Sequence, residues 1–416
     1  MNILILGAGG REHAMAWAVR QNPKCDRLIV APGNAGTAQV AENHALNILD
    51  GAAVTAFAQD HAIDLVLIGP EAPLAAGVAD ALRAANIPTL GPTQAAAQLE
   101  ASKTFTKEIC DAANIPTAGW SGFTDAAEAH AYVDANGAPI VVKADGLAAG
   151  KGVTVAETAD AAHAAIDALF TEPGAACVLE EMLTGEEASF FVLCDGDTAL
   201  PIGTAQDHKR AYDGDEGPNT GGMGAYSPAP VLTDTTANRV MEEIIHPTLA
   251  EMTRRGTPFQ GILYAGLMIE NGAPKLIEYN TRLGDPEAQV LMMRLGAQAL
   301  DLFQAAAEGR LLDAKVNWAD DRALCVVLAA EGYPGAYDKG TQIRGLETCP
   351  DTSTETVFHA GTTAEGDRIL ATGGRVLTAT ARASTLQEAH DRAYALAEKI
   401  DWPEGRYRTD IGHRAL

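Results

Sequence analysis

Short apolar runs that end at glycine or proline and are followed by helical patterns constrain the fold of this chain most strongly. A run of roughly four to eight apolar residues is typical of a buried strand, and strands that alternate with helices are typical of a parallel sheet. We therefore predict an N-terminal α/β domain over residues 1–101. Its expected strands lie at 2–6, 28–31, 64–68 and 87–90, and its expected helices at 12–21 and 75–85.

Beyond residue 101 the pattern changes to hairpins and short helices. Ser102 is a suitable N-cap for a helix over 102–113, and Asn271-Gly272 predicts a tight hairpin turn. Residues 206–228 are polar and rich in glycine, and we expect them to form a long functional loop. Further strands are expected at 139–144, 153–156, 176–181, 188–194, 262–269, 274–280, 323–329 and 375–381, and further helices at 159–169, 238–255, 285–295, 298–308 and 385–399.

These patterns predict a multidomain protein of the α/β and α+β classes. After the N-terminal domain we expect a central domain over residues 102–320 and a small C-terminal α+β domain over 321–416. Within the central domain, a small unit of hairpins at about 120–190 is a candidate for a mobile lid.

The formal net charge of −25 restricts the partners of the chain. Such a surface repels nucleic acid, so we expect no DNA or RNA partner. A phosphate-bearing ligand must then be held by local groups, such as backbone N–H groups, a few lysines or arginines, or a metal ion.

Neither the apolar residues nor the cysteines indicate a membrane protein or a secreted one. Hydrophobic residues make up 47% of the chain, no apolar run reaches the length of a membrane span, and no signal peptide precedes the first expected strand. The six cysteines are scattered without a C-x-x-C pair. We therefore expect a cytoplasmic protein with reduced thiols and no membrane contact.

The glycines after the first expected strand form the first candidate site. Residues 7–12 (GAGGRE) follow a strand and open a helix, so their N–H groups and the helix dipole suit an anion. The dinucleotide fingerprint requires glycine where Glu12 stands, which makes an NAD site a poor fit. A sugar-phosphate site and a plain tight turn both remain open.

A second glycine-rich segment, residues 143–152 (KADGLAAGKG), begins at Lys143 on an expected strand. Glycine lets successive amides point toward anionic oxygens and form a nest. The segment is not a Walker A loop, because Lys151 is followed by Gly152 and not by serine or threonine. The alternative is a flexible hairpin turn.

Two further segments carry clustered polar residues. Residues 180–187 (EEMLTGEE) lie where one expected strand ends and another begins, a place where backbone can pair with an adenine edge and a carboxylate can bind ribose hydroxyls. On the later strand, Glu278 and Asn280 are two residues apart and present their oxygens on one face. Such oxygens suit Mg²⁺, and Arg282 could clamp a phosphoryl oxygen. The alternatives are a surface hairpin and a solvated strand face.

These segments, in this order, resemble the ATP-grasp superfamily, and their amino-acid sequences are similar to the motifs of the phosphoribosylamine–glycine ligase family. The similarity extends over essentially the whole chain. It is carried by GAGGREHA at 7–14, PGNAGT at 32–37, GPEAPL at 69–74, KADGLAAGKGV at 143–153, LEEMLTGEEASF at 179–190, HKRAYDGDEGPNTGGMGAYSP at 208–228, RLGDPEAQV at 282–290 and YRTDIGHRA at 407–415.

The resemblance implies an ATP-grasp fold whose N-terminal domain is like that of biotin carboxylase. It implies the ligation of glycine to 5-phosphoribosylamine, which gives glycinamide ribonucleotide in the second step of purine synthesis. ATP would become ADP and phosphate, with Mg²⁺ or Mn²⁺ as cofactor and a glycyl phosphate as intermediate. We expect a monomer, with a weak dimer as the alternative.

The resemblance also implies roles for single residues. ATP would be bound by Lys103, Lys143, Gly146, Gly150 and Gly152, by the backbone of Glu180 and Leu183, and by Glu187. The metal ion would be bound by Glu278 and Asn280. The substrates would be bound by Gly10, Arg11, Glu71, Asp207, Asp213, Asp285 and Arg408, and the residues expected to act in catalysis are Arg282, Lys143 and Asp285. The preceding strand has Gly266 where many ATP-grasp enzymes have an acidic ligand, so we assign no third metal ligand.

Other functions remain open at this point. An NAD-dependent oxidoreductase would use the first domain and leave residues 143–152 and 278–282 without a role. A non-catalytic ATP-binding regulator would need a damaged metal pair, whereas Glu278 and Asn280 are intact. Another ATP-grasp ligase with a different acid or amine is the nearest alternative, although a carboxylase would usually carry a biotin-carrier segment, which this sequence lacks.

Overall fold

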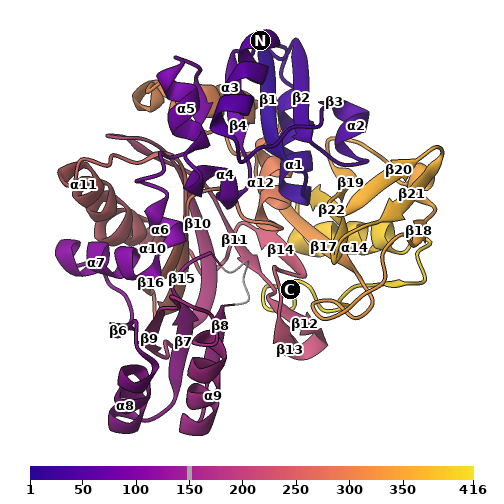
Figure 1. The fold of residues 1–416 in the computed structure, drawn as a ribbon. Coiled ribbons are helices and arrows are strands. Elements are labelled where there is room, and N and C mark those ends of the chain that lie inside the picture. Colours follow the sequence, from indigo (N-terminus) through magenta and orange to yellow (C-terminus); the bar gives the residue numbers. More distant parts are fainter. Residues whose placement is uncertain (148–151) are drawn as a thin grey trace.

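The structure, a computed structural model, describes residues 1–147 and 152–416. An N-terminal α/β domain and a large central sheet form the body, and a small subdomain projects from it (Figure 1). In these described ranges, no helix has both the length and the apolar character that crossing a bilayer requires.

The N-terminal domain contains the predicted parallel sheet, in the strand order β3-β2-β1-β4-β5. Its elements are β1 Asn2–Gly7, α1 Gly10–Arg20, β2 Arg27–Pro32, α2 Thr37–Val40, β3 Glu42–Asn43, α3 Gly51–Asp60, β4 Leu65–Ile68, α4 Glu71–Ala75, α5 Val78–Ala84 and β5 Thr89–Leu90. Strand β1 is apolar from Ile3 to Leu6 because both of its faces are buried there. The predicted helix over 75–85 is interrupted at Gly77, whose φ of +79° favours glycine.

A nine-stranded sheet runs through the central and C-terminal regions, in the order β16-β15-β10-β11-β14-β17-β22-β19, with β23 paired to β17. Its strands are β10 Glu186–Asp195, β11 Ala199–Asp207, β14 Gly224–Ser227, β15 Gln260–Glu270, β16 Ala273–Asn280, β17 Arg322–Ala330, β19 Glu355–His359, β22 Arg375–Ala383 and β23 Gly405–Arg406. The predicted turn at Asn271-Gly272 joins β15 to β16, with φ of +52° and +75°. The C-terminal strands therefore extend the central sheet.

The predicted loop over residues 206–228 is wrong. Strands β12 Arg210–Tyr212 and β13 Glu216–Asn219 form a hairpin, and β14 connects β11 to β17 in the large sheet. Strand β14 has only four residues, all of them buried, so it has no alternating pattern by which a short strand could be predicted.

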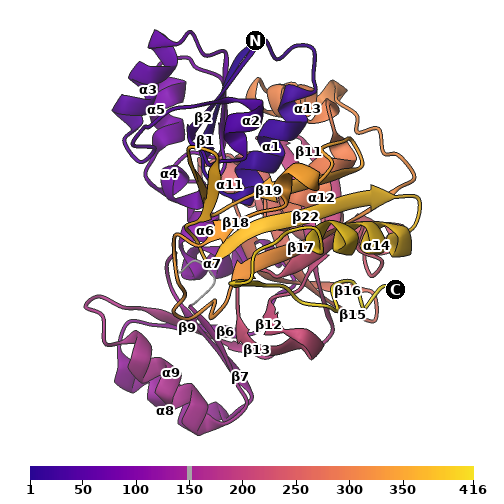
Figure 2. The same cartoon turned by 90° about the vertical axis from the view of Figure 1, so that its right-hand side faces the viewer.

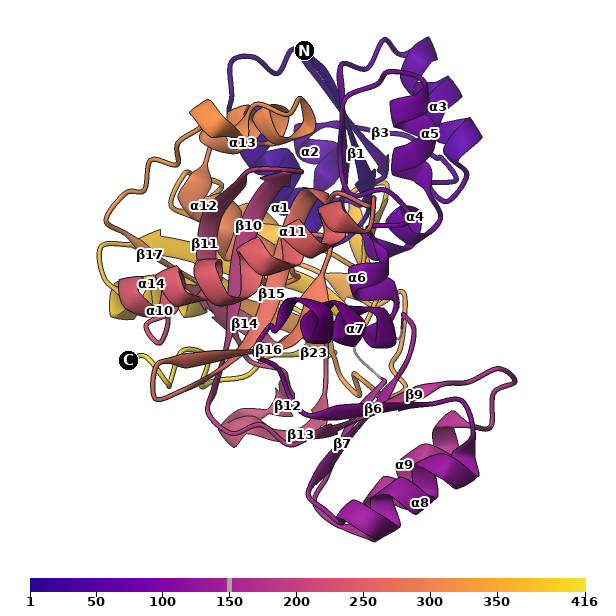
Figure 3. The same ribbon diagram turned by 90° about the vertical axis from the view of Figure 1, so that its left-hand side faces the viewer.

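The projecting subdomain is a separate four-stranded sheet covered by two helices (Figure 3). Its elements are β6 Trp120–Phe123, α8 Ala126–Asn136, β7 Ile140–Ala144, β8 Val153–Ala156, α9 Ala159–Leu169 and β9 Cys177–Glu181. Helix α9 has the predicted bounds. The next strand, β10, belongs to the large sheet, so the sheet of the subdomain ends at Glu181 and not near residue 190.

Helix α1 connects the N-terminal domain to the rest of the body. Its side chains are buried along most of its length, because α12 (Glu287–Leu295) and β19 pack against it. Figure 2 shows these three elements next to one another. The residues that follow Gly9 are thus placed against residues from the end of the central domain and from the C-terminal region.

The remaining helices cover the faces of the large sheet. Helix α7 begins after Ser102, as predicted, and Ser102 Oγ accepts a hydrogen bond from the Phe105 N–H at 3.1 Å. The predicted helix over 238–255 is divided by a π-helical segment at Met241–Ile245. The other α-helices and strands are α6 Gln98–Ala101, α7 Lys103–Ala113, α10 Asp234–Val240, α11 His246–Arg254, α13 Gln298–Ala307, β18 Gln342–Ile343, β20 Thr362–Glu365, β21 Arg368–Ala371 and α14 Leu386–Ala397. Short 3-10 helices lie at Asp213–Asp215, Leu311–Asp313 and Leu346–Thr348.

Candidate active site

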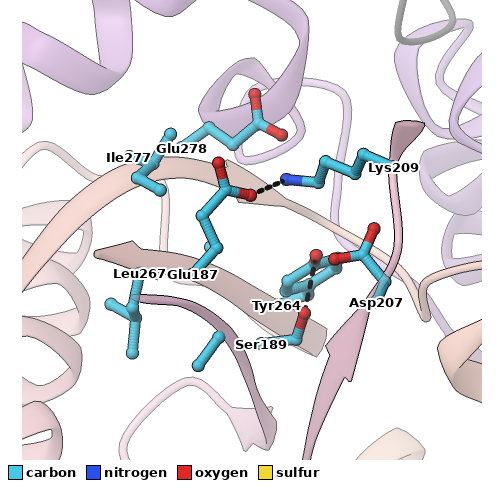
Figure 4. A pocket seen from close by; sticks show the side chains of 10 residues that line it. Glu187, Ser189, Asp207, Lys209, Tyr264, Leu267, Ile277 and Glu278 are labelled. Atoms are coloured by element: carbon cyan, nitrogen blue, oxygen red, sulfur yellow. Dashed lines mark hydrogen bonds and ion pairs between the residues drawn. The ribbon is translucent and has the colours of Figure 1, made fainter. Parts of the chain in front are cut away.

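A polar pocket lies where β10, β11, β15 and β16 meet in the large sheet. Figure 4 shows Glu187, Asp207 and Glu278 pointing into it together with the ammonium group of Lys209. Because three carboxylates face one ammonium group, the pocket attracts cations. Its lining residues are Glu187, Ala188, Ser189, Asp207, Lys209, Tyr264, Gly266, Leu267, Ile277 and Glu278.

Lys209 and Glu187 form an ion pair in this pocket, with Nζ 2.6 Å from Oε2. Burial alone would lower the pKa of Lys209, but the charges of Glu187 and Asp207 outweigh it and raise that pKa well above its usual value. The charge of Lys209 in turn lowers the pKa of Glu187. Both groups are therefore ionised at neutral pH, and Glu187 is held in place.

Asp207 differs from Glu187 in its ionisation. Burial raises the pKa of Asp207 to about 6, with Lys209 opposing the shift and the charges of Glu287 and Glu187 adding to it. A carboxylate with a raised pKa gains most from a bound cation. An ammonium group or metal ion near Asp207 would therefore bind more tightly as the pH rises through about 6.

A bulge in β16 sets the orientation of the two predicted metal ligands. The pairing of β15 with β16 slips between Leu276 and Glu278, which leaves Ile277 as an extra residue. Beyond the bulge, Glu278 and Asn280 have partly exposed side chains, whereas Tyr279 between them is buried. Glu278 and Asn280 therefore lie on the same face of the strand.

The oxygens of this pair fit a small divalent cation. Among the described residues, the Glu278 carboxylate has no hydrogen-bond or ion-pair partner, and Asn280 Oδ1 accepts one hydrogen bond, from Arg282 Nη2 at 3.0 Å. A carboxylate and an amide oxygen form a donor set that Mg²⁺ accepts, with phosphate and water completing its shell. On β15, Gly266 lies opposite Glu278 and offers no side chain as a ligand.

Two lysines predicted to bind phosphate lie near the predicted metal ligands Glu278 and Asn280. Lys143 Nζ donates to Glu180 Oε2 at 2.9 Å and to the Ile277 carbonyl at 3.2 Å. Burial lowers the pKa of Lys103, and the charge of Glu278 acts in the opposite direction, with Lys143 also close enough to contribute. The structure thus brings Lys103, Lys143 and Glu278 together.

Asp145 belongs to this site but was not predicted from the sequence. Its Oδ1 accepts hydrogen bonds from the N–H of Lys103 at 2.6 Å and from the N–H of Thr104 at 3.4 Å. These groups form the N-terminus of α7, where a helix favours negative charge. The contact joins the end of β7 to α7 and so orients Lys103 relative to Lys143. The K-x-D spacing at residues 143–145 is the local sequence signal that could have indicated Asp145.

The structure describes both ends of the predicted phosphate loop. Gly146 has a φ of +133°, which strongly favours glycine, and its carbonyl accepts a hydrogen bond from Lys103 Nζ at 3.1 Å. At the other end, the Gly152 carbonyl accepts a hydrogen bond from the N–H of Ala144 at 2.7 Å. Gly150, also predicted to bind ATP, lies outside the described residues.

The predicted adenine contacts lie at the end of β9. Glu180 is part of β9, whereas Leu183 lies in the connection from β9 to β10. Within the described ranges, the N–H and C=O of Leu183 make no hydrogen bond. Backbone groups without partners are available to pair with the edge of a base.

A second cluster of site residues joins the N-terminal domain to the segment after β16. Arg282 forms ion pairs with Glu100 at 2.8 Å and with Glu71 at 3.5 Å, and Arg11 Nη1 donates to the Leu283 carbonyl at 3.1 Å. Burial alone would lower the pKa of Arg282, but Glu100 and Glu71 raise it above its usual value. The charges of Arg282, Glu71 and Glu100 are therefore paired.

Asp285 belongs to the same cluster. Its Oδ1 is 3.6 Å from Arg375 Nη2, and a Cβ on Gly9 would lie 3.3 Å from its Oδ2. Burial alone would raise the pKa of Asp285, but Arg375 and Arg11 lower it. Arg375 was missed because it follows two glycines far along the chain and no motif marks it. The predicted residues that meet in this cluster are Gly10, Arg11, Glu71, Arg282 and Asp285.

The structure places Arg408 and Asp213 away from these predicted roles. Arg408 is fully buried, and its nitrogens lie 2.9 Å from Asp215 Oδ1 and 2.7 Å from Asp410 Oδ2. Asp213 Oδ1 accepts a hydrogen bond from the N–H of Thr409 at 2.8 Å. Since these contacts fold the C-terminal tail onto the β12–β13 hairpin, they occupy the groups that were expected to bind phosphoribosylamine and glycine.

His208, Asp215 and His413 are close enough together to be considered as metal ligands. However, His208 Nε2 accepts a hydrogen bond from the Gly412 N–H at 2.9 Å, so the neutral ring carries its proton on Nδ1. Burial lowers the pKa of His208, which keeps the ring neutral. A protonated Nδ1 is not a metal ligand, and His208 instead supports the tail.

Models of three domains from one protein family match consecutive parts of the chain. They are the N domain of phosphoribosylglycinamide synthetase over residues 1–100, its ATP-grasp (A) domain over residues 101–288, and its C domain over residues 323–414.

Curated relatives and solved structures agree with this match. The chain is 58% identical to the phosphoribosylamine–glycine ligase of Mesorhizobium japonicum and 54% identical to that of Vibrio cholerae, in each case over 100% of this chain and 99% of the relative. The solved phosphoribosylamine–glycine ligase of Thermotoga maritima superposes with a TM-score of 0.87 at 31% identity, over 99% of this chain and 100% of that one. A biotin carboxylase domain from Hydrogenobacter thermophilus shares the fold alone, with a TM-score of 0.73 at 18% identity over 98% of this chain and 91% of that one. With matches of this extent, the chain belongs to the phosphoribosylamine–glycine ligase family, whose central domain has the ATP-grasp fold.

Proposed function

We propose that this chain joins glycine to 5-phosphoribosylamine with ATP, and releases glycinamide ribonucleotide, ADP and phosphate in the second step of purine synthesis. One observation carries the proposal beyond family membership. Glu278 of the pocket lies close to the half-buried Lys103, which is itself near the buried Lys143, and this arrangement suits a nucleotide bound with a divalent cation. It leaves no role for a nicotinamide cofactor.

ATP would lie between the projecting subdomain and the body. Lys103 and Lys143 would bind its phosphates, and the backbone at Leu183 would pair with adenine, together with that of Glu180. Glu187, held by Lys209, would accept the ribose hydroxyls. In this arrangement the adenine would lie at the end of β9 and the ribose at the pocket.

Glu278 and Asn280 would hold the metal ion, Mg²⁺ or Mn²⁺. When bound, that ion neutralises charge on the phosphate oxygens. Arg282, which already donates to Asn280, would neutralise further charge on the transferred phosphoryl group. Most of the catalysis is then positioning and charge compensation.

Glycine needs activation because a carboxylate oxygen is a poor leaving group. The glycine carboxylate attacks the γ-phosphorus, the bond from that phosphorus to ADP breaks, and glycyl phosphate forms. The amine of phosphoribosylamine then attacks the acyl carbon, a C–N bond forms, and the C–O bond to phosphate breaks as the amine loses a proton. Asp207 and Asp285 are the carboxylates we propose for the ammonium group of glycine.

Phosphoribosylamine would bind at the cluster of Gly10, Arg11 and Glu71. Gly10 opens α1, where backbone N–H groups favour an anion. Arg282 lowers the pKa of Glu71 against the effect of burial, so Glu71 is ionised and can accept hydrogen bonds from ribose hydroxyls.

An acyl phosphate is hydrolysed by water, so the site must close during the reaction. We propose that the projecting subdomain serves as the lid, because its strand β7 carries Lys143 and the described ends of the phosphate loop, Gly146 and Gly152, lie next to β7 and β8. We also propose a cytoplasmic monomer without nucleic-acid or membrane partners. The net charge of −25 and the six free cysteines support this assignment.

The test is ADP release by the purified protein with ATP, Mg²⁺, glycine and phosphoribosylamine generated in situ. We expect turnover only when both substrates are present, with glycinamide ribonucleotide identified by mass spectrometry. Turnover with another acid or amine in place of either substrate, and none with this pair, would contradict the proposal.

A further inference from the structure

Glu180 joins two lysines that come from different parts of the molecule. Lys107 Nζ lies 3.1 Å and Lys143 Nζ lies 2.9 Å from the same oxygen, Glu180 Oε2. Only 2% to 3% of each of these side chains is exposed. The other oxygen, Oε1, is buried and has no hydrogen-bond partner in the described part of the chain. Both ammonium groups therefore share one oxygen.

The two lysines extend from different elements, although Lys143 Nζ also reaches β16 through the Ile277 carbonyl. Lys107 belongs to α7 and donates to Thr117 Oγ1 at 2.7 Å, and Thr117 donates to the Leu276 carbonyl at 2.6 Å. Lys107 is thus attached to β16 in the body. Lys143 extends from β7 of the projecting subdomain, and Figure 3 shows α7 beside the place where the subdomain joins the body. Burial lowers the pKa of Lys107, and the charge of Glu180 opposes that effect. The Glu180 carboxylate therefore favours the charged form of Lys107.

Lys143 could not leave Glu180 at low cost if it were the only partner. A buried carboxylate that loses its one ammonium partner is strongly destabilised, because its charge is left without compensation. Lys107 supplies a second ammonium group on the same oxygen. Because Thr117 holds it, Lys107 stays beside Glu180 when the Lys143 side chain alone turns away.

We propose that Lys107 is a positioning residue for ATP binding, because it keeps Glu180 paired while the Lys143 ammonium turns from Glu180 to a nucleotide phosphate. This inference rests on the proposed function, in which Lys143 binds ATP. It assigns to Lys107 a role in nucleotide affinity without contact to the nucleotide.

The variant Lys107→Met tests the inference. Glu180 then has Lys143 as its sole partner, so a phosphate must compete with a buried carboxylate for that ammonium group. We expect the KM for ATP in the ADP-release assay to rise at least about tenfold, with kcat changed by less than about threefold. In the double variant Lys107→Met/Glu180→Gln the competing charge is absent, and the KM for ATP should return to within about threefold of the wild-type value.

The matched control is Lys275→Met, because Lys275 pairs with the exposed Glu181, at 3.7 Å, and not with Glu180. Its KM for ATP should equal that of the wild type. An unchanged KM in Lys107→Met, or a raised KM that persists in the double variant, would overturn the inference. If circular dichroism shows that Lys107→Met does not fold, Lys107→Gln takes its place on the same terms, because its amide is also uncharged.

Equilibrium binding of a fluorescent ATP analogue separates this inference from the proposed function. A wild-type protein that does not bind the analogue contradicts the function itself. Binding with equal affinity by the wild type and by Lys107→Met contradicts only the role of Lys107. Binding that is weakened in Lys107→Met and restored in the double variant supports it.

Discussion

Replacing Glu278 by glutamine is expected to lower kcat by about 10³-fold at saturating substrates and Mg²⁺. Glutamine keeps the shape of the side chain but removes the negative charge that would hold the metal ion beside the γ-phosphate. The fold should be unchanged, because Glu278 has no hydrogen-bond or ion-pair partner among the described residues. The measurements are ADP release over a range of Mg²⁺ concentrations and the thermal unfolding midpoint.

The control for this change is Glu270→Gln, at the exposed end of β15. It removes one carboxylate from the same sheet and should leave kcat unchanged. Wild-type turnover in Glu278→Gln at ordinary Mg²⁺ concentrations would remove the metal assignment.

Replacing Arg282 by methionine is expected to lower both stability and activity. The change leaves the carboxylates of Glu100 and Glu71 without their ion-pair partner. Because these pairs are partly buried, the loss in free energy of unfolding should exceed the roughly 1 kcal/mol of a surface pair and approach the about 3–5 kcal/mol of a buried one. It also removes a positive charge from the transferred phosphoryl group, which should lower kcat by about 10²-fold. Urea unfolding and the ADP-release assay measure the two effects.

Arg310→Met is the matched control, because Arg310 pairs with Glu308 at an exposed position. Surface pairs contribute at most about 1 kcal/mol, so this variant should unfold close to the wild-type midpoint. A loss below about 1 kcal/mol in Arg282→Met would show that the cluster at Glu71 and Glu100 is not held by Arg282.

Elements with a strong local signal could be predicted from the sequence. The apolar runs of the N-terminal sheet, the N-cap at Ser102 and the turn at Asn271-Gly272 each depend on neighbouring residues, and the structure has them. Strand β14 could not be predicted in this way, because four buried residues pair with strands far away in the chain. The continuation of the central sheet into the C-terminal region depends on that strand.

The same distinction applies to the candidate site. Glu278 and Asn280 share one strand, so their spacing predicts a common face. The ion pairs of Glu180 and Arg282 join residues that are far apart in sequence, and no local pattern predicts them. The ion pair of Arg408 with Asp215 could not be predicted for the same reason, since the two residues meet only after the tail has folded back.

The isotope content of the released phosphate tests the central claim most directly. If ATP activates glycine, the oxygen that leaves during amide formation passes from glycine to phosphate. Glycine labelled with ¹⁸O in its carboxylate, incubated with ATP, Mg²⁺ and phosphoribosylamine in unlabelled water, should therefore give inorganic phosphate with one ¹⁸O per turnover, as measured by mass spectrometry. Unlabelled phosphate formed alongside normal amounts of glycinamide ribonucleotide would contradict the account, because glycine would then not have been phosphorylated.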